Sequence, residues 1–211
     1  MVLSGVNGEV REGLGLAAGV RVFQMPNTNG ARTSNDDLRL SLAYRPKNSD
    51  WIVLDRLDFI IDERRDSSFD YNTWRTVNNL NVNYKPAHDM QIALQYACKY
   101  VQETIDQLDY RGYTDLIGLE GRYDVTKTWD IGLRVKVLHS WSADQYKYGT
   151  GPFVGFNFAK NLLLQVGYNI TGFSDRDFSK ADFTACGPFL KLSLKFDQMS
   201  IREAVKLFSG Q

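Results

Sequence analysis

The feature that most constrains this chain is a two-residue alternation of apolar and polar side chains near its C-terminus. From Leu190 to Phe196 the sequence reads LKLSLKF, so apolar residues take every second position and two lysines lie between them. A period of two indicates a β-strand, because successive side chains of a strand point to opposite faces. In a soluble sandwich the apolar face packs on a second sheet. In a transmembrane barrel it meets lipid, and the lysines face the lumen.

The same alternation recurs in nine further stretches. The third stretch is the least regular, because charges at Asp55, Arg56 and Asp58 interrupt it, and a β-bulge is the expected reason. The ten predicted strands are Gly13–Phe23, Asp36–Arg45, Trp51–Asp62, Trp74–Tyr84, Met90–Val101, Tyr113–Tyr123, Trp129–Trp141, Phe153–Phe158, Leu162–Ile170 and Phe183–Phe196.

The connections between these strands favour a membrane barrel over a soluble sandwich. Short connections of three to five residues alternate with long ones of about ten. Outer-membrane barrels have short periplasmic turns and longer outside loops, whereas a soluble meander has no reason to sort its loops. The sequence therefore predicts an all-β, antiparallel, up-and-down transmembrane β-barrel of about ten strands. Closure requires the last strand to pair with both Leu162–Ile170 and Gly13–Phe23.

Aromatic residues cluster at the predicted strand ends, as they do at the two membrane–water interfaces of such barrels. Between the two ends lies a largely aliphatic band. The predicted aromatic girdle comprises Tyr44, Trp51, Tyr84, Tyr123, Trp129, Phe158 and Phe196 beside the short turns, and Trp141 beside a long loop.

The polar faces of the strands carry many charges, which we expect to point into the lumen. A narrow barrel can be filled by its own side chains, so these charges either pair into a plug or line a small cation-rich channel. The predicted lumen-facing charges are Arg39, Arg45, Arg56, Asp58, Arg75, Lys99, Glu120, Arg122, Arg134, Lys136, Lys191 and Lys195.

Composition excludes several classes of protein. Lysine plus arginine equals aspartate plus glutamate at 25 each, so nucleic acid is not an expected partner. No apolar run approaches the ~18 residues of a membrane helix. The N-terminus lacks a cationic start followed by an apolar run, so it is not a signal peptide, and the chain is expected to be mature or the end of a longer polypeptide. The predicted segments are a lead-in at 1–12, the barrel at 13–196 and a tail at 197–211.

Few residues suggest chemistry. No Ser/His/Asp set, glycine-rich phosphate loop or Cys/His cluster is present, so we expect no enzyme, cofactor or metal. His139, near the outer end of its strand, gives an architectural resemblance to the omptin proteases, but an interfacial residue is the simpler interpretation. The acidic segments Asp62-Glu63 and Asp175-Arg176-Asp177 are candidates for binding a divalent ion or lipopolysaccharide, and solvated loops explain them as well. Cys98 and Cys186 are predicted to be unpaired and to face outward.

The tail reads DQMSIREAVKLFSGQ from Asp197 to Gln211. Ser200 and Glu203 form a capping-box pair, and apolar residues follow at helical spacing. The pattern predicts a short amphipathic helix on the periplasmic side, where it docks under the barrel, lies on the membrane or contacts another protein.

Four segments resemble the C-terminal barrel of very large repeat-containing surface proteins of Gram-negative bacteria. The resemblance implies an outer-membrane anchor or export module for a larger passenger or complex, inserted by the barrel assembly machinery among lipid and lipopolysaccharide. It also allows further strands upstream of Met1 and a count of 12. A small pore and an omptin-like enzyme are the alternatives. The matching segments are WIVLDRLD (Trp51–Asp58), YTDLIGLE (Tyr113–Glu120), GYNITGFSDRDFS (Gly167–Ser179) and GPFLKLSLKFDQ (Gly187–Gln198).

Overall fold

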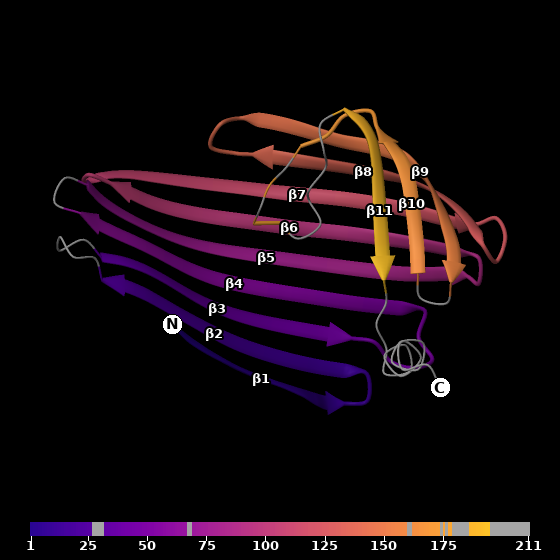
Figure 1. The fold of residues 1–211 in the computed structure, drawn as a ribbon, viewed down its shortest axis with the longest axis horizontal. Helices are drawn as coiled ribbons and strands as arrows, with labels where there is room; N and C mark the ends of the chain where they lie inside the picture. The colour runs from indigo at the N-terminus through magenta and orange to yellow at the C-terminus, as the bar shows by residue number, and fades with distance from the viewer. Residues whose placement is uncertain are drawn as a thin grey trace, which may run out of the picture.

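The computed structural model describes residues 1–26, 32–66, 69–159, 162–173, 175, 177–178 and 186–194, and these form a single antiparallel sheet. Figure 1 shows β1 to β7 running side by side and β9, β10 and β11 turned across their direction. Among the described residues, no helix is long and apolar enough to cross a membrane. The strands are β1 (Val2–Arg11), β2 (Leu14–Pro26), β3 (Arg32–Tyr44), β4 (Trp51–Asp66), β5 (Phe69–Ala87), β6 (Met90–Ile105), β7 (Leu108–Asp124), β8 (Trp129–Ser140), β9 (Gln145–Ala159), β10 (Leu162–Asn169) and β11 (Gly187–Leu194).

Each strand pairs with the next along the chain, so the predicted all-β, up-and-down antiparallel class is confirmed. The described strands number eleven rather than ten, because residues 1–12, expected to be a lead-in, contain β1. β1 pairs with β2 from Val2 opposite Val22 onward. Its three valines share one face, but Ser4 and Gly8 stand between them and Leu3 lies on the other face, so the alternation that identified the other strands is weak here.

The sheet is open between its two edge strands, β1 and β11. The predicted pairing of the last strand with Leu162–Ile170 is confirmed by β10–β11, but its predicted pairing with Gly13–Phe23 is wrong, because β2 lies between β1 and β3. Val6 on β1 and Leu190 on β11 are each 71% exposed. In an antiparallel meander with an odd number of strands, the two edge strands run in the same direction. Direct pairing of β1 with β11 would therefore be parallel. Antiparallel closure requires an even number of strands.

The predicted long loops are largely extensions of the strands. The stretches expected to be loops at 63–72 and 103–111 belong mostly to β4, β5, β6 and β7, and only residues 106–107 separate β6 from β7. Asp106 and Gln107 have φ of 46° and 72°, the left-handed conformation that a tight hairpin turn needs. Sequence patterning missed these extensions because they carry charged and polar residues on both faces.

The two faces of the sheet differ in kind. We call the face that carries Arg39, Lys99 and Arg134 the inner face, since most of the buried polar side chains, such as those of Asp58, Gln95 and Lys136, lie on it. The opposite, outer face exposes aliphatic residues such as Leu119 and Leu133. The division follows the two-residue alternation of every strand from β2 to β11.

The irregular pattern of the third predicted strand does not come from a bulge. β4 keeps one register with β5 from Trp51 opposite Tyr84 to Asp66 opposite Phe69, so the expected bulge is wrong. Asp55 instead takes an outer-face position, where Asn78 donates a 2.8 Å hydrogen bond to its carboxylate. A polar side chain is tolerated on this apolar face because its neighbour satisfies it.

Glycines on the inner face of β9 let the sheet curl there. Gly149, Gly151 and Gly155 lie opposite Lys136, Arg134 and Asp130 of β8. A Cβ at Gly155 would overlap the carboxylate of Asp130, which is fully buried. Because these three positions of β9 carry no side chain, β8 can approach β10 and β11 across the inner face.

Candidate functional site

The inner face is the candidate functional site, and most of the predicted lumen-facing charges lie on it. Arg45 follows the end of β3, where its backbone N–H donates to the Gly13 carbonyl, and Lys195 lies outside the described residues. The alternation of each strand places on the inner face Arg39, Arg56, Asp58, Arg75, Lys99, Glu120, Arg122, Arg134, Lys136 and Lys191.

One group of ion pairs joins β2, β3 and β4. Arg39 and Arg56 both contact Asp58, with Nε atoms 2.6 and 2.8 Å from the two carboxylate oxygens, and Asp58 is only 3% exposed. Arg21 adds a longer contact of 3.4 Å to Asp37. A carboxylate this buried is stable because two guanidinium groups share it.

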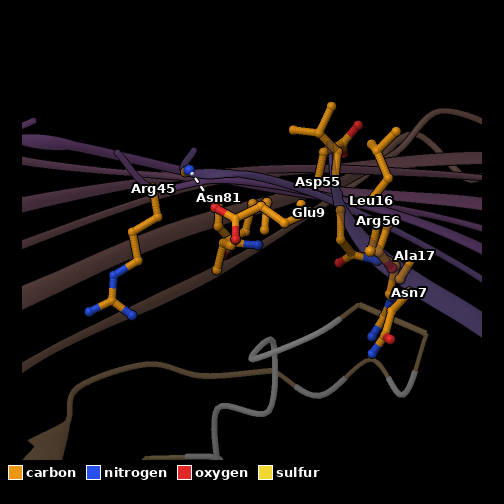
Figure 2. A pocket seen from close by; sticks show the side chains of 16 residues that line it. Asn7, Glu9, Leu16, Ala17, Arg45, Asp55, Arg56 and Asn81 are labelled. Atoms are coloured by element: carbon orange, nitrogen blue, oxygen red, sulfur yellow. Dashed lines mark hydrogen bonds between the residues drawn. The ribbon is translucent and has the colours of Figure 1, made fainter. Parts of the chain in front are cut away.

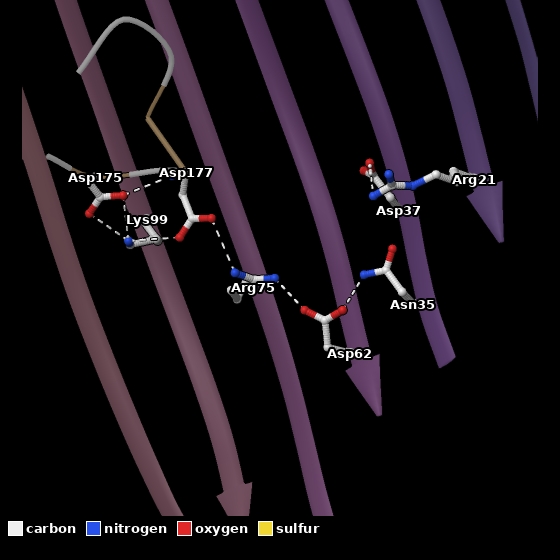
Figure 3. A network of polar contacts seen from close by, with 8 residues as sticks. All are labelled: Arg21, Asn35, Asp37, Asp62, Arg75, Lys99, Asp175 and Asp177. Atoms are coloured by element: carbon white, nitrogen blue, oxygen red, sulfur yellow. Dashed lines mark hydrogen bonds and ion pairs between the residues drawn. The ribbon is translucent and has the colours of Figure 1, made fainter. Parts of the chain in front are cut away.

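A second group crosses β4, β5 and β6 and reaches the segment between β10 and β11. Figure 3 shows Asp62, Arg75, Asp177, Lys99 and Asp175 in one continuous network. Arg75 binds Asp62 through Nη2 and lies 3.3 Å from Asp177 through Nη1. The Lys99 ammonium is 2.9 Å from Asp175 and 3.0 Å from Asp177. Two cations on the sheet therefore hold two carboxylates from a segment far away in sequence.

Phe173 and Phe178 of the same segment fill the space beside these ion pairs. Both are almost fully buried, and the Phe178 ring lies 5.3 Å from the Lys99 ammonium. The described residues between β10 and β11 thus cover the inner face, where we expected an outside loop. We call Phe173, Asp175, Asp177 and Phe178 the inserted residues. The two phenylalanines share a hydrophobic cluster with Val77, Ala97, Leu116 and Leu138.

The inserted residues change the interpretation of the acidic pair. Asp175 and Asp177 were candidates for a divalent ion or lipopolysaccharide, but both are paired with Lys99 or Arg75. Among the described residues, no group of three or more His, Cys, Asp or Glu is arranged to hold a metal ion. The sequence signal was the phenylalanines flanking the acidic residues, since exposed loops rarely need two large apolar side chains.

A third group joins β7, β8, β9, β10 and β11. Arg134 donates from Nε to Glu120 at 2.7 Å and from Nη2 to Gln165 at 3.0 Å. Its guanidinium lies over the ring of Phe153 at 4.3 Å and near that of Phe189 at 5.4 Å. The planar cation thus contacts two aromatic rings and is paired with a carboxylate at once.

Toward the β1 edge the inner face is hollow rather than filled. A hollow of about 730 Å³ lies there. Arg45, Arg56 and Asn81 are among the side chains that line it (Figure 2). Small residues of β2 and β3, including Gly15 and Ala43, leave this space. The ion-paired region and the hollow therefore divide the inner face along the sheet.

The predicted girdle residues lie at strand ends. Trp51 begins β4 and stacks on Tyr84 with ring centroids 4.2 Å apart, and Trp129 begins β8. Tyr44, Tyr123 and Trp141 are exposed. Phe196 lies outside the described residues, as does the side chain of Phe158. The predicted tail helix at 197–211 also lies outside them.

His139 belongs to the outer face, on the same side as Asp115. Its Nδ1 is 3.8 Å from an Asp115 oxygen, and its ring stacks on Tyr146 at 4.1 Å and packs on Trp141 at 4.4 Å. The Trp141 indole N–H donates to Asp115 at 3.2 Å. This arrangement holds the imidazole among aromatic rings at the end of β8.

Both cysteines are free thiols. Cys98 takes an outer-face position on β6, between Asn78 and Asp115 in the ladder, and is half-buried. Cys186 is exposed just before β11, with its sulfur 3.7 Å from the Tyr168 hydroxyl.

The chain was compared with known proteins. No family model matches it, and no curated protein does. Two solved porin structures are similar in fold. A NanC porin structure in a rhombohedral crystal form has a TM-score of 0.47 at 10% identity, covering 92% of this chain and 98% of that one. A KdgM porin in complex with disordered oligogalacturonate has a TM-score of 0.42 at 15% identity, covering 92% and 91%. Both scores lie below 0.5, and neither likeness supports an inference about this chain.

Proposed function

We propose that the chain is an outer-membrane β-barrel that anchors, or helps to export, a larger surface protein or complex, with a lumen closed over part of its length. The observation that carries the closed lumen is the set of inserted residues held on the inner face by Lys99 and Arg75. A barrel whose interior is filled by its own residues serves better as an anchor than as a wide pore.

The outer face supports the membrane location. Leu119, Leu133 and Val166 expose about half of their surface there, which is costly in water but favourable in lipid. The strands from β3 to β9 have 12 to 19 residues, and about 9–11 suffice to cross a bilayer. The aromatic residues at the strand ends fit the interfaces. Lipid, lipopolysaccharide and the barrel assembly machinery are then the partners during and after insertion.

The anchor role rests on the resemblance to barrels that end very large repeat-containing surface proteins. It predicts that an antiserum raised against this chain detects, in the outer-membrane fraction of the source cells, a polypeptide far larger than 211 residues. Staining of the inner-membrane and soluble fractions serves as the control. A band no larger than this chain in the outer-membrane fraction would favour a self-contained barrel.

A narrow pore is the second candidate, because the hollow beside β2 and β3 leaves part of the inner face unfilled. Planar-bilayer recording separates the two. If the inserted residues close the lumen, the reconstituted protein is expected to leave the conductance near that of the bare bilayer. A large, steady, anion-selective current would overturn the closed lumen and support the pore.

We also propose that the chain is not an enzyme. The histidine that lies within 4 Å of an acidic side chain is His139, beside Asp115, and its ring packs on Tyr146 and Trp141 on the outer face. A general base needs access to a substrate proton, which this packing does not favour.

A further inference from the structure

A second inner-face cavity lies between β11 and the strands β5 to β8. Its volume is about 560 Å³. Asn81 and Asn83 of β5 and Gln91 of β6 line one side, and Phe189 and Lys191 of β11 line the other. β5 and β11 are not neighbours in the sheet, so the curl at β9 is what brings them to one cavity.

The cavity borders the hydrophobic cluster that the inserted residues complete. Ala97 of that cluster lies on the inner face of β6, two positions beyond the cavity residue Gln95, and Val77 lies on the inner face of β5, four positions beyond the cavity residue Asn81. The buried rings of Phe173 and Phe178 therefore close the cavity at the end of the strands where the long hairpins, such as that between β6 and β7, lie. The cavity is reached from the opposite end, where the short turns lie.

The lining combines amides with positive charge. Three cations, Arg134, Lys136 and Lys191, face one carboxylate, Glu120, whose oxygen is already bonded to Arg134 at 2.7 Å. Lys136 is 8% exposed, and its ammonium donates a hydrogen bond to the side-chain amide oxygen of Gln95 at 2.9 Å. Carboxamides both donate and accept hydrogen bonds, which suits hydroxyl groups, whereas an ammonium suits a carboxylate.

We propose that this cavity binds a small carboxylate that also carries hydroxyl groups. The carboxylate lies toward Lys136 and Lys191, and the hydroxyls exchange hydrogen bonds with the amides of β5 and β6. The mixture of one aromatic ring, several amides and excess positive charge is typical of a ligand pocket that fixes a polar solute by a few placed groups. The inference is independent of the anchor role, because it concerns binding alone.

Gluconate and sorbitol are the probes, since they share a hydroxylated chain and differ by the carboxylate. The full chain in detergent micelles, at fixed ionic strength, is titrated with each by calorimetry. Gluconate is expected to bind at one site per chain and about tenfold more tightly than sorbitol, the ratio that one charge-assisted contact gives. No gluconate binding at millimolar concentration, or equal affinity for both probes, would overturn the proposal.

Two variants locate the site, and a third controls for charge. Lys191→Gln, at an exposed position of β11, is expected to weaken gluconate binding about tenfold without affecting folding. Asn83→Ala is expected to weaken binding of gluconate from the opposite wall. Lys47→Gln removes the same charge from an exposed turn residue outside the cavity and is expected to change nothing. If Lys47→Gln and Lys191→Gln weaken gluconate binding equally, the binding reflects unspecific electrostatic attraction, and the proposed site is wrong.

Discussion

Replacing Lys99 with methionine is expected to lower the free energy of unfolding by about 3 kcal/mol and to raise the bilayer conductance well above that of the wild type. The Lys99 ammonium is the shared partner of Asp175 and Asp177, and all three side chains are largely buried. Removing one partner of a buried ion pair costs about 3–5 kcal/mol because it leaves charge uncompensated, and the remaining exposure places this case at the lower end. Denaturant titration and planar-bilayer recording measure the two effects.

The matched control for this variant is Lys85→Met, which removes an exposed lysine from β5. It is expected to match the wild type in stability and conductance, since exposed charges contribute little. Adding Asp175→Asn and Asp177→Asn to Lys99→Met removes the uncompensated carboxylates and is expected to recover much of the lost stability. If Lys99→Met behaves like Lys85→Met, the inserted residues are not held by this ion pair.

Much of the sheet could be predicted from local pattern alone. Alternation identified β2 to β11 in order, because a strand with one apolar face repeats every two residues whatever it packs against. For the same reason Arg39, Glu120 and Lys136 could be assigned to one face. β1 was missed because Ser4 and Gly8 separate its three valines and leave its apolar face weak. The hairpin extensions were missed because neither of their faces is apolar.

The filling of the inner face could not be predicted in this way. The contact between Arg75 and Asp177 joins residues 102 positions apart, and no local pattern records such a pairing. The same holds for the contacts of Arg134 with the rings of Phe153 and Phe189, which depend on the curl at β9. Local pattern fixes which face a side chain takes, whereas its partner on that face is set by how the whole sheet bends.

Replacing Gly132 with alanine is expected to destabilise the protein by about 1–3 kcal/mol, the usual cost of overpacking a close contact. A Cβ at this position would overlap the Phe153 ring and lie 2.7 Å from the Gly121 carbonyl oxygen. Phe153 is nearly fully buried and carries the Arg134 guanidinium on its face, so moving the ring also disturbs the Arg134 contacts. Denaturant titration in micelles measures the loss.

Gly121→Ala is the matched control, because the two glycines are on neighbouring strands and a Cβ at Gly121 meets nothing within 4 Å. Glycine inside a strand costs about 0.5–1 kcal/mol relative to alanine, so this variant is expected to be neutral or slightly stabilising. Combining Gly132→Ala with Phe153→Leu tests the cause, since a smaller side chain frees the space that the new Cβ needs. The two changes should then be less destabilising together than their sum. Strict additivity would mean that Gly132 and Phe153 do not compete for space.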